Sequence, residues 1–254
     1  ETANYKVGMA TTINFKIGEK EWVNKTKMTT VSPFALQKFL SECVKAGCHW
    51  VVIETTSHAI AQYRNWGIDY DVAVLTNITP DHLDRYRSLD DYYRLKERIV
   101  ENCGGEDLYF FNADDAGCVS VAARFPGRLA PFSSTREADG GAWLEGDDLV
   151  RTDPGGARER IIGRREMGVV GIHNAENALA AVSSLQGLGI PADACRRALA
   201  AFRGLEHRME RVAVISGVTW YNDSKATNVE AAVKSLSGLG APVVLIAGGY
   251  DKGS

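Results

Sequence analysis

Four side chains that can bind anions or exchange protons lie within five positions near the end of the chain. They are an acid, two hydroxyls and a lysine, in the run Asp223-Ser-Lys-Ala-Thr227. An apolar, β-branched run, Val212 to Trp220, precedes them, and a helical pattern begins at Val229. A strand that delivers a polar turn to the start of a helix commonly holds a phosphate or a carboxylate. A helix cap beside a solvated lysine gives the same pattern, so this run alone leaves both interpretations open.

A second set of polar residues follows apolar runs in the first half of the chain. Glu54 ends the run that starts at Trp50, and Asp81-His82 follow the run from Asp71 to Thr76. Ligands of parallel sheets collect outside the carboxyl ends of strands, where a carboxylate and an imidazole could hold a divalent metal. From spacing alone, a helix cap or a core position explains His82 better, and a solvated helix position explains Lys96 better.

Length and composition exclude several classes of protein. The 254 residues can bury one large core or two smaller ones, and the net charge of -3 gives no basic surface, so we expect no nucleic-acid partner. No apolar run has membrane-spanning length and the start does not resemble a signal peptide, so we expect no membrane insertion. The five cysteines have irregular spacings and indicate reduced thiols in a cytoplasmic protein. The sequence does not indicate an oligomeric state.

Apolar runs alternate with helical patterns over most of the chain. This alternation predicts an α/β fold with a mostly parallel central sheet flanked by helices. The apolar runs are short and nearly continuous, which is typical of strands buried on both faces. Predicted strands lie at 7–14, 50–54, 71–76 and 108–112, and predicted helices at 33–46 and 89–102, with Gly47 ending the first helix.

The pattern changes twice in the second half. Short β-like pieces separated by Gly, Asp and Pro predict a small antiparallel subsheet at 142–145, 148–151 and 159–162. Two helices are then predicted at 173–187 and 192–202. A predicted boundary near Gly204 separates a first domain, residues 1–205, from residues 206–254. The pattern of the second segment predicts the start of a Rossmann-like domain, with a strand at 212–221, a helix at 227–237 and a strand at 243–247.

Seven motifs occur in one order and together resemble a known family. The chain is similar to the ATP-dependent Mur ligases, the amide-forming enzymes of peptidoglycan precursor synthesis, over nearly its whole length. Any one motif is weak, but seven in sequence are a specific signal. The motifs are Glu54-Thr-Thr-Ser-His58, Thr76-Asn-Ile-Thr-Pro-Asp-His-Leu-Asp84, Tyr92 to Lys96, Asn112-Ala-Asp-Asp115, Gly171 to Leu179, His207-Arg208 and Asn222 to Asn228.

The resemblance implies ATP-dependent chemistry and a role for each matching residue. ATP would activate a carboxylate as an acyl phosphate, which an incoming amine attacks while Mg²⁺ neutralises charge on the transferred phosphoryl group. The resemblance implies that Glu54 and His82 bind Mg²⁺ and that Lys96 is carbamylated, which turns a cation into an anionic ligand. It places Asn174 and Asn177 near the adenine, Arg208 at the nucleotide, and Asp223 where an acid positions ribose or lysine side chains.

The two parts of the chain resemble different members of the family. Residues 1–83 resemble the ligase that adds the third amino acid to UDP-MurNAc-dipeptide, and Thr29, Thr30, Ser57 and Arg64 match its contacts to that substrate. Residues 84–254 resemble the D-glutamate-adding ligase. That resemblance implies that Lys225, Thr227 and Lys252 hold the D-glutamate carboxylates, since two lysines facing a dicarboxylate are electrostatically favourable.

Lysine and arginine usage changes at the same junction. Before Asp84 the chain has seven lysines and one arginine, and from Asp84 onward it has four lysines and seventeen arginines. This change favours a mosaic of two parents, with a divergent lineage as the alternative. The main hypothesis is a D-glutamate-adding ligase, and the alternatives are a ligase that adds lysine or diaminopimelate, a folylpolyglutamate synthetase, and a non-catalytic α/β binding module.

One family motif does not occur in these residues. The Gly-x-x-Gly-Lys-Thr/Ser phosphate loop is absent from the chain, although its backbone amides and lysine form the main cradle for a triphosphate. We therefore interpret the chain as a segment of a longer protein, with a central ATPase domain lacking its phosphate loop and a truncated amino-acid-binding domain. We expect residues 1–254 alone to bind ATP weakly and not to ligate.

Overall fold

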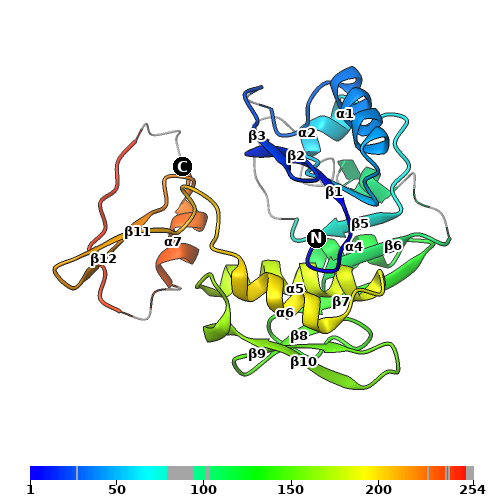
Figure 1. Ribbon diagram of the computed structural model, residues 1–254. Coiled ribbons are helices and arrows are strands. Elements are labelled where there is room, and N and C mark those ends of the chain that lie inside the picture. Colours follow the sequence, from blue (N-terminus) through cyan, green and yellow to red (C-terminus); the bar gives the residue numbers. More distant parts are fainter. Residues whose placement is uncertain are drawn as a thin grey trace. The chain divides into compact units, whose positions relative to one another are not determined.

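The computed structural model describes residues 1–26, 28–78, 94–95, 97–100, 103, 105–227, 229–237, 239 and 241–249 (Figure 1). The chain divides into two compact units, Glu1–Ala130 and Pro131–Ser254. The predicted domain boundary between residues 205 and 206 stays a prediction. The fold is α/β, with parallel strand pairs flanked by helices and a small antiparallel sheet, as the sequence predicts.

The first unit begins with a four-stranded sheet in the order β3-β2-β1-β4. The parallel pair is β1 (Val7–Ala10) with β4 (Trp50–Ile53), and Ala10 lies opposite Ile53. The predicted strand at 7–14 ends early, because the chain turns into β2 (Asn14–Ile17) and then β3 (Lys20–Val23), both antiparallel. This two-strand extension was not predicted, although Gly18 at a φ of +57° is a usual turn residue.

Helix α1 (Pro33–Lys45) has clear start and stop signals in the sequence. The Ser32 hydroxyl accepts a hydrogen bond from the Ala35 amide at 3.4 Å, and Pro33 occupies the first helical position. Leu36, Phe39 and Cys43 recur at helical spacing and pack against Ala10 and Phe15 of the sheet. This packing confirms the predicted helix and forms the core of the four-stranded sheet.

The prediction that the strands are buried on both faces is wrong for two of them. Val52 in β4 is 57% exposed, and Val74 in β5 (Val72–Leu75) is 39% exposed. The described residues cover one face of each strand, so alternate side chains stay open. Nearly continuous apolar runs therefore do not establish double-sided burial here.

A second parallel pair completes the strands of the first unit. Strand β5 pairs with β6 (Leu108–Asn112), and helix α4 (Ala116–Ala122) packs against β6. Tyr109, Cys118 and Val121 form the centre of this core. The short helix α2 (Ser57–Ala61) follows β4, and a 3₁₀ turn spans Arg98–Val100. Most of the predicted helix at 89–102 lies outside the described residues.

The second unit contains the predicted antiparallel subsheet. The chain enters this unit within β7 (Arg128–Ser133), which pairs in parallel with β8 (Ala142–Glu145). Strand β9 (Asp148–Thr152) pairs antiparallel with β8 on one side and with β10 (Arg158–Gly163) on the other. A 3₁₀ turn, Arg164–Glu166, leads towards the predicted helices, which are confirmed as α5 (Ile172–Gly187) and α6 (Ala192–Ala201). Figure 1 shows these helices against the β8–β10 sheet, in agreement with their contacts.

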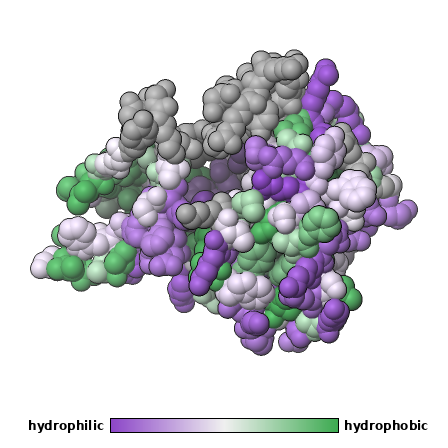
Figure 2. Space-filling view, turned by 90° about the horizontal axis from the view of Figure 1, so that it is seen from above, coloured by the Kyte–Doolittle hydropathy of each residue, from purple (hydrophilic) through white to green (hydrophobic). Residues whose placement is uncertain are grey.

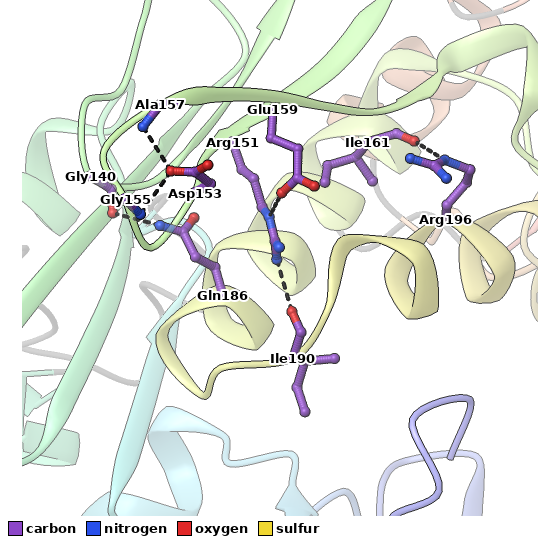
Figure 3. Close-up of polar contacts among 10 residues, drawn as sticks. All are labelled: Gly140, Arg151, Asp153, Gly155, Ala157, Glu159, Ile161, Gln186, Ile190 and Arg196. Carbon is purple, nitrogen blue, oxygen red and sulfur yellow. Dashed lines mark hydrogen bonds and ion pairs between the residues drawn. The ribbon is translucent and has the colours of Figure 1, made fainter.

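Arginine side chains connect this sheet to its helices (Figure 3). Arg151 of β9 is 4% exposed, and its guanidinium donates to the Glu159 carboxylate at 2.9 Å and to the Ile190 carbonyl at 3.0 Å. Arg196 of α6 donates to the carbonyl of Ile161 at 2.8 Å. A buried guanidinium needs such partners, because an unpaired buried charge is costly.

The last part of the second unit differs from the predicted strand, helix and strand. The run 212–221 is two strands, β11 (Glu210–Ile215) and β12 (Val218–Asn222), rather than one. Ser216 and Gly217 both have positive φ, at 50° and 78°, which is the conformation of a two-residue hairpin turn. Helix α7 (Val229–Ser237) is confirmed, whereas the predicted strand at 243–247 is wrong because those residues have no ladder partner in the described part of the chain.

Apolar side chains are exposed on this last part, at the left of Figure 2. They come from the hairpin and from the extended segment after α7, and include Val212, Val214, Ile215, Val218, Trp220, Val244 and Ile246. The predicted Rossmann-like architecture of residues 206–254 stays a prediction.

Candidate active site

Glu54 lies at the carboxyl end of β4, where the sequence predicts a metal ligand. Its backbone amide continues the parallel ladder by donating to the Ala10 carbonyl at 2.9 Å. Two residues beyond Ala10, Thr12 donates its backbone amide and its hydroxyl to Glu54 Oε2, at 2.8 and 2.9 Å. The parallel pairing of β1 with β4 therefore fixes one oxygen of an exposed carboxylate.

A hydroxyl relay continues from Glu54 to Thr29. The hydroxyls of Thr12 and Thr29 lie 2.8 Å apart. Because Thr12 has one hydroxyl hydrogen and Glu54 Oε2 accepts it, Thr29 donates to Thr12. Within the described ranges no hydrogen bond reaches Glu54 Oε1, so this oxygen is the one that could face a cation.

Thr30 and Arg64 hold the segment beside this relay. Thr30 is 2% exposed, and its hydroxyl donates to the Glu54 carbonyl at 2.9 Å and accepts from the Thr56 amide at 3.3 Å. Arg64 donates to the Thr30 carbonyl at 2.8 Å. Ser57 is the first residue of α2, three residues after Glu54. Thr29, Thr30, Ser57 and Arg64 therefore gather around one strand end, although Thr30 and Arg64 are engaged in local structure.

Three predicted site residues, His82, Lys96 and Lys252, lie outside the described residues. In the described part of the chain, no three His, Cys, Asp or Glu side chains form a cluster that could hold a metal ion. Of the three predicted magnesium ligands, Glu54 lies in the described part of the chain, and the magnesium site as a whole stays a prediction.

In the second unit, Asn174 and Asn177 lie in the first turns of α5. Asn174 Nδ2 donates to the Val170 carbonyl at 2.6 Å, which anchors the loop before the helix, and Asn177 is exposed. The helix starts after Gly171, which has a φ of +100° and no room for a side chain, because a Cβ would lie 2.8 Å from the His173 ring. The tight entry therefore presents the exposed Asn177 amide one turn into the helix.

The remaining predicted residues come from two loops that are joined by hydrogen bonds. Asp223 accepts from the Met209 amide at 3.0 Å, and the Lys225 amide donates to the His207 carbonyl at 3.0 Å. Arg208 lies in the same turn, between His207 and Met209, and its side chain is exposed. Hydrogen bonds from the Asp223 carboxylate and the Lys225 amide to the 207–209 turn thus bring Asp223 and Lys225 close to Arg208.

His207 and Glu210 strengthen this junction. Asn222 Nδ2 donates to His207 Nδ1 at 2.8 Å, and the His207 amide donates to Glu210 at 2.8 Å. His207 itself has a φ of +67°, a strained conformation that these contacts hold. The side chains of Lys225 and Thr227 are exposed and stand on a loop that is fixed at its base.

Sequence reasoning did not select Thr12 or Glu210 as site residues. Thr12 could have been found from the predicted parallel pairing, because residues just after two neighbouring parallel strands meet at one edge. Glu210 has no comparable signal, since its role depends on the local turn at His207.

Comparisons with known proteins agree on one family. Residues 1–185 match the model of the Mur ligase middle domain. The chain is 42% identical over 204 residues to "UDP-N-acetylmuramoylalanine--D-glutamate ligase" of Syntrophotalea carbinolica, which covers 80% of this chain and 44% of that protein. The same-named protein of Koribacter versatilis is 40% identical over 205 residues, with 81% and 45% covered. The chain thus spans less than half the length of these relatives.

Solved structures support the fold. A UDP-N-acetylmuramoyl-L-alanyl-D-glutamate--2,6-diaminopimelate ligase superposes with a TM-score of 0.67 at 22% identity, covering 82% of this chain and 43% of that one. MurF from Acinetobacter baumannii superposes with a TM-score of 0.66 at 17% identity, covering 93% and 49%. None of the helices in the described ranges has the length and apolar character that crossing a bilayer requires.

Proposed function

Because the chain belongs to the Mur ligase family, we propose that it is part of an ATP-dependent ligase that joins D-glutamate to the carboxylate of UDP-N-acetylmuramoyl-L-alanine. The observation that carries this proposal is the agreement between the relatives and the C-terminal signature. Several relatives named for the D-glutamate reaction are 40–43% identical over 72–81% of the chain. The run from Asn222 to Asn228 resembles the signature of the same enzyme. The mosaic origin of the chain and its cytoplasmic location stay predictions.

The chemistry of Glu54 fits a magnesium ligand. Its carboxylate is exposed at the end of a parallel strand, and Thr12 occupies one oxygen while leaving the other open. Hard oxygen donors of this kind suit Mg²⁺, which would neutralise charge on the phosphates of ATP when bound. We propose Glu54, His82 and carbamylated Lys96 as its protein ligands, with Thr12 as the residue that orients Glu54.

The second unit would bind the nucleotide and the amino acid. We propose that Asn174 and Asn177 contact the adenine and that Arg208 contacts the nucleotide. Asp223 would position groups near the ribose, and its bond from Met209 holds it in place. The exposed ammonium of Lys225, with Thr227 and Lys252, would attract the D-glutamate carboxylates and direct the amine to the activated acyl carbon.

Thr29, Thr30, Ser57 and Arg64 would form the muramoyl-peptide side of the site. Thr29 shares the hydroxyl relay with Glu54, so the acid substrate and the metal ligand would be connected by Thr12. Arg64 holds the Thr30 carbonyl and would keep this segment in place for the carboxylate.

The test is a ligation assay with the gene product that contains residues 1–254. We expect ATP, Mg²⁺, UDP-N-acetylmuramoyl-L-alanine and D-glutamate to give ADP, phosphate and the dipeptide product, detected by mass spectrometry. Omission of D-glutamate is the control. If the folded protein gives no dipeptide product under these conditions, the proposal is wrong.

A further inference from the structure

Two cysteines meet at the end of α1, away from the residues assigned to catalysis. Helix α1 ends with a left-handed glycine, Gly47, at a φ of +72°. The Gly47 amide donates to the Val44 carbonyl at 2.9 Å, and the Cys48 amide donates to the Cys43 carbonyl at 3.0 Å. This pair of bonds defines a Schellman motif, which brings the side chains at its two ends into contact.

Both ends of this motif are cysteines. The contact is usually hydrophobic, and here the partly buried Cys48 packs against the core that contains Cys43. The backbone of the motif therefore already places the two cysteine side chains side by side. From this geometry we propose that Cys43 and Cys48 form a reversible intramolecular disulfide, a redox modification site at the end of α1.

The two thiols differ in access, which sets the order of the reaction. Cys43 is 0% exposed and lies against Gly8, where an added Cβ would come within 2.6 Å of its sulfur. Burial raises the pKa of Cys43 to about 12, so its thiolate is scarce near neutral pH. Cys48 is partly exposed and is the thiol that an external oxidant can reach.

The chemistry with a small-molecule disulfide such as oxidised glutathione is balanced. The Cys48 thiolate attacks one glutathione sulfur, the external S–S bond breaks, and one glutathione thiolate leaves. Cys43 then loses its proton to solvent and its sulfur attacks Cys48, which expels the second glutathione thiolate. The two protein thiols lose two electrons in total, and the external disulfide gains them.

Trypsin gives a direct readout, because Lys45 lies between the two cysteines. The native chain is incubated with oxidised glutathione, the remaining thiols are blocked with N-ethylmaleimide, and the digest is analysed by mass spectrometry. We expect peptide 39–45 to stay linked to peptide 46–64 and to separate on reduction. A wild-type digest with glutathione on Cys48 but no linked pair, with cross-links between other cysteines, or with no reaction would overturn the proposal.

Two variants check the order of the steps. Cys43→Ala should retain glutathione on Cys48, because no second thiol is present to release it. Cys48→Ser changes the more exposed partner and should leave Cys43 unmodified under the same treatment. Equal modification of Cys43 in this second variant would contradict the assigned entry thiol, even if Cys43→Ala fails to fold.

Discussion

Thr12 donates both its backbone amide and its hydroxyl to Glu54 Oε2, at 2.8 and 2.9 Å. The contact depends on the parallel pairing of β1 with β4, which places the residues after Ala10 and Ile53 at one edge. It converts a flexible carboxylate into one with a fixed oxygen and an open oxygen. Partners of this kind orient metal ligands, and their mutation typically lowers metal affinity by about 10- to 100-fold.

Replacement of Thr12 by valine should weaken Mg²⁺ binding in the complete enzyme, so that ligation requires more Mg²⁺. Valine removes the hydroxyl but keeps the shape and the backbone amide. We expect the Mg²⁺ concentration for half-maximal activity to rise by about 10- to 100-fold, as for other residues that hold metal ligands. Thr12→Ser is the matched control and should retain activity. Identical Mg²⁺ titrations for Thr12→Val and wild type would exclude the orienting role.

Replacement of Lys225 by alanine should affect the amino-acid substrate selectively. Loss of one charge-assisted hydrogen bond to a carboxylate should raise the KM for D-glutamate by roughly 10- to 100-fold, with little change in the KM for ATP. Lys38 on the exposed face of α1 offers a control, since Lys38→Ala removes a lysine far along the chain from this loop. Equal changes in both KM values would show that Lys225 does not bind the amino acid selectively.

Replacement of Arg151 by methionine should destabilise the second unit. Methionine fills similar space but leaves the Glu159 carboxylate and the Ile190 carbonyl without the guanidinium (Figure 3). Breaking a buried pair costs about 3–5 kcal/mol, and the lower end applies because Glu159 is 37% exposed. Urea denaturation gives the free energy of unfolding. Arg151→Lys should lower the free energy of unfolding less than Arg151→Met does. A urea midpoint for Arg151→Met equal to that of the wild type would contradict this stabilising role of Arg151.

Stability should fall at alkaline pH because of buried thiols. Burial raises the pKa of Cys43 to about 12 and that of Cys103 to about 11, from an ordinary value of 9.0. Between about pH 9 and 11 the unfolded chain releases these protons while the folded chain retains them. The free energy of unfolding therefore falls with rising pH, by up to about 1.4 kcal/mol per pH unit for each thiol.

Urea midpoints measured from about pH 8 to 10.5 check this expectation, with a reductant present throughout. Cys103→Ala should reduce the slope, because it removes one of the two contributions. Constant midpoints over this range would show that the two thiols do not control alkaline stability.

The elements with strong local signals could be predicted from the sequence. Helix α1 has a serine cap, Pro33 and Gly47, and the β8–β10 sheet has turn residues between short apolar pieces. The sequence predicts one strand where the structure has the β11–β12 hairpin, because Ser216-Gly217 is a short interruption in an otherwise apolar run. The positive φ of both residues and the antiparallel pairing of the two strands show that the chain reverses there.

The candidate site was predictable to the extent that its residues follow strands or helix starts. Glu54 was found in this way, and the contacts of Asp223 with the 207–210 turn place it near Arg208. Thr12 depends on which strands pair, and His207 depends on a strained turn held by Asn222 and Glu210. Such tertiary relationships leave no periodic pattern in the sequence.

Amine selectivity tests the central claim most directly. The gene product that contains residues 1–254 is supplied with ATP, Mg²⁺ and either UDP-N-acetylmuramoyl-L-alanine or its D-glutamyl dipeptide form, and ADP release is followed. We predict amine-dependent ADP release with UDP-N-acetylmuramoyl-L-alanine and D-glutamate. Release that requires the dipeptide substrate with lysine or diaminopimelate, and not D-glutamate, would contradict the account.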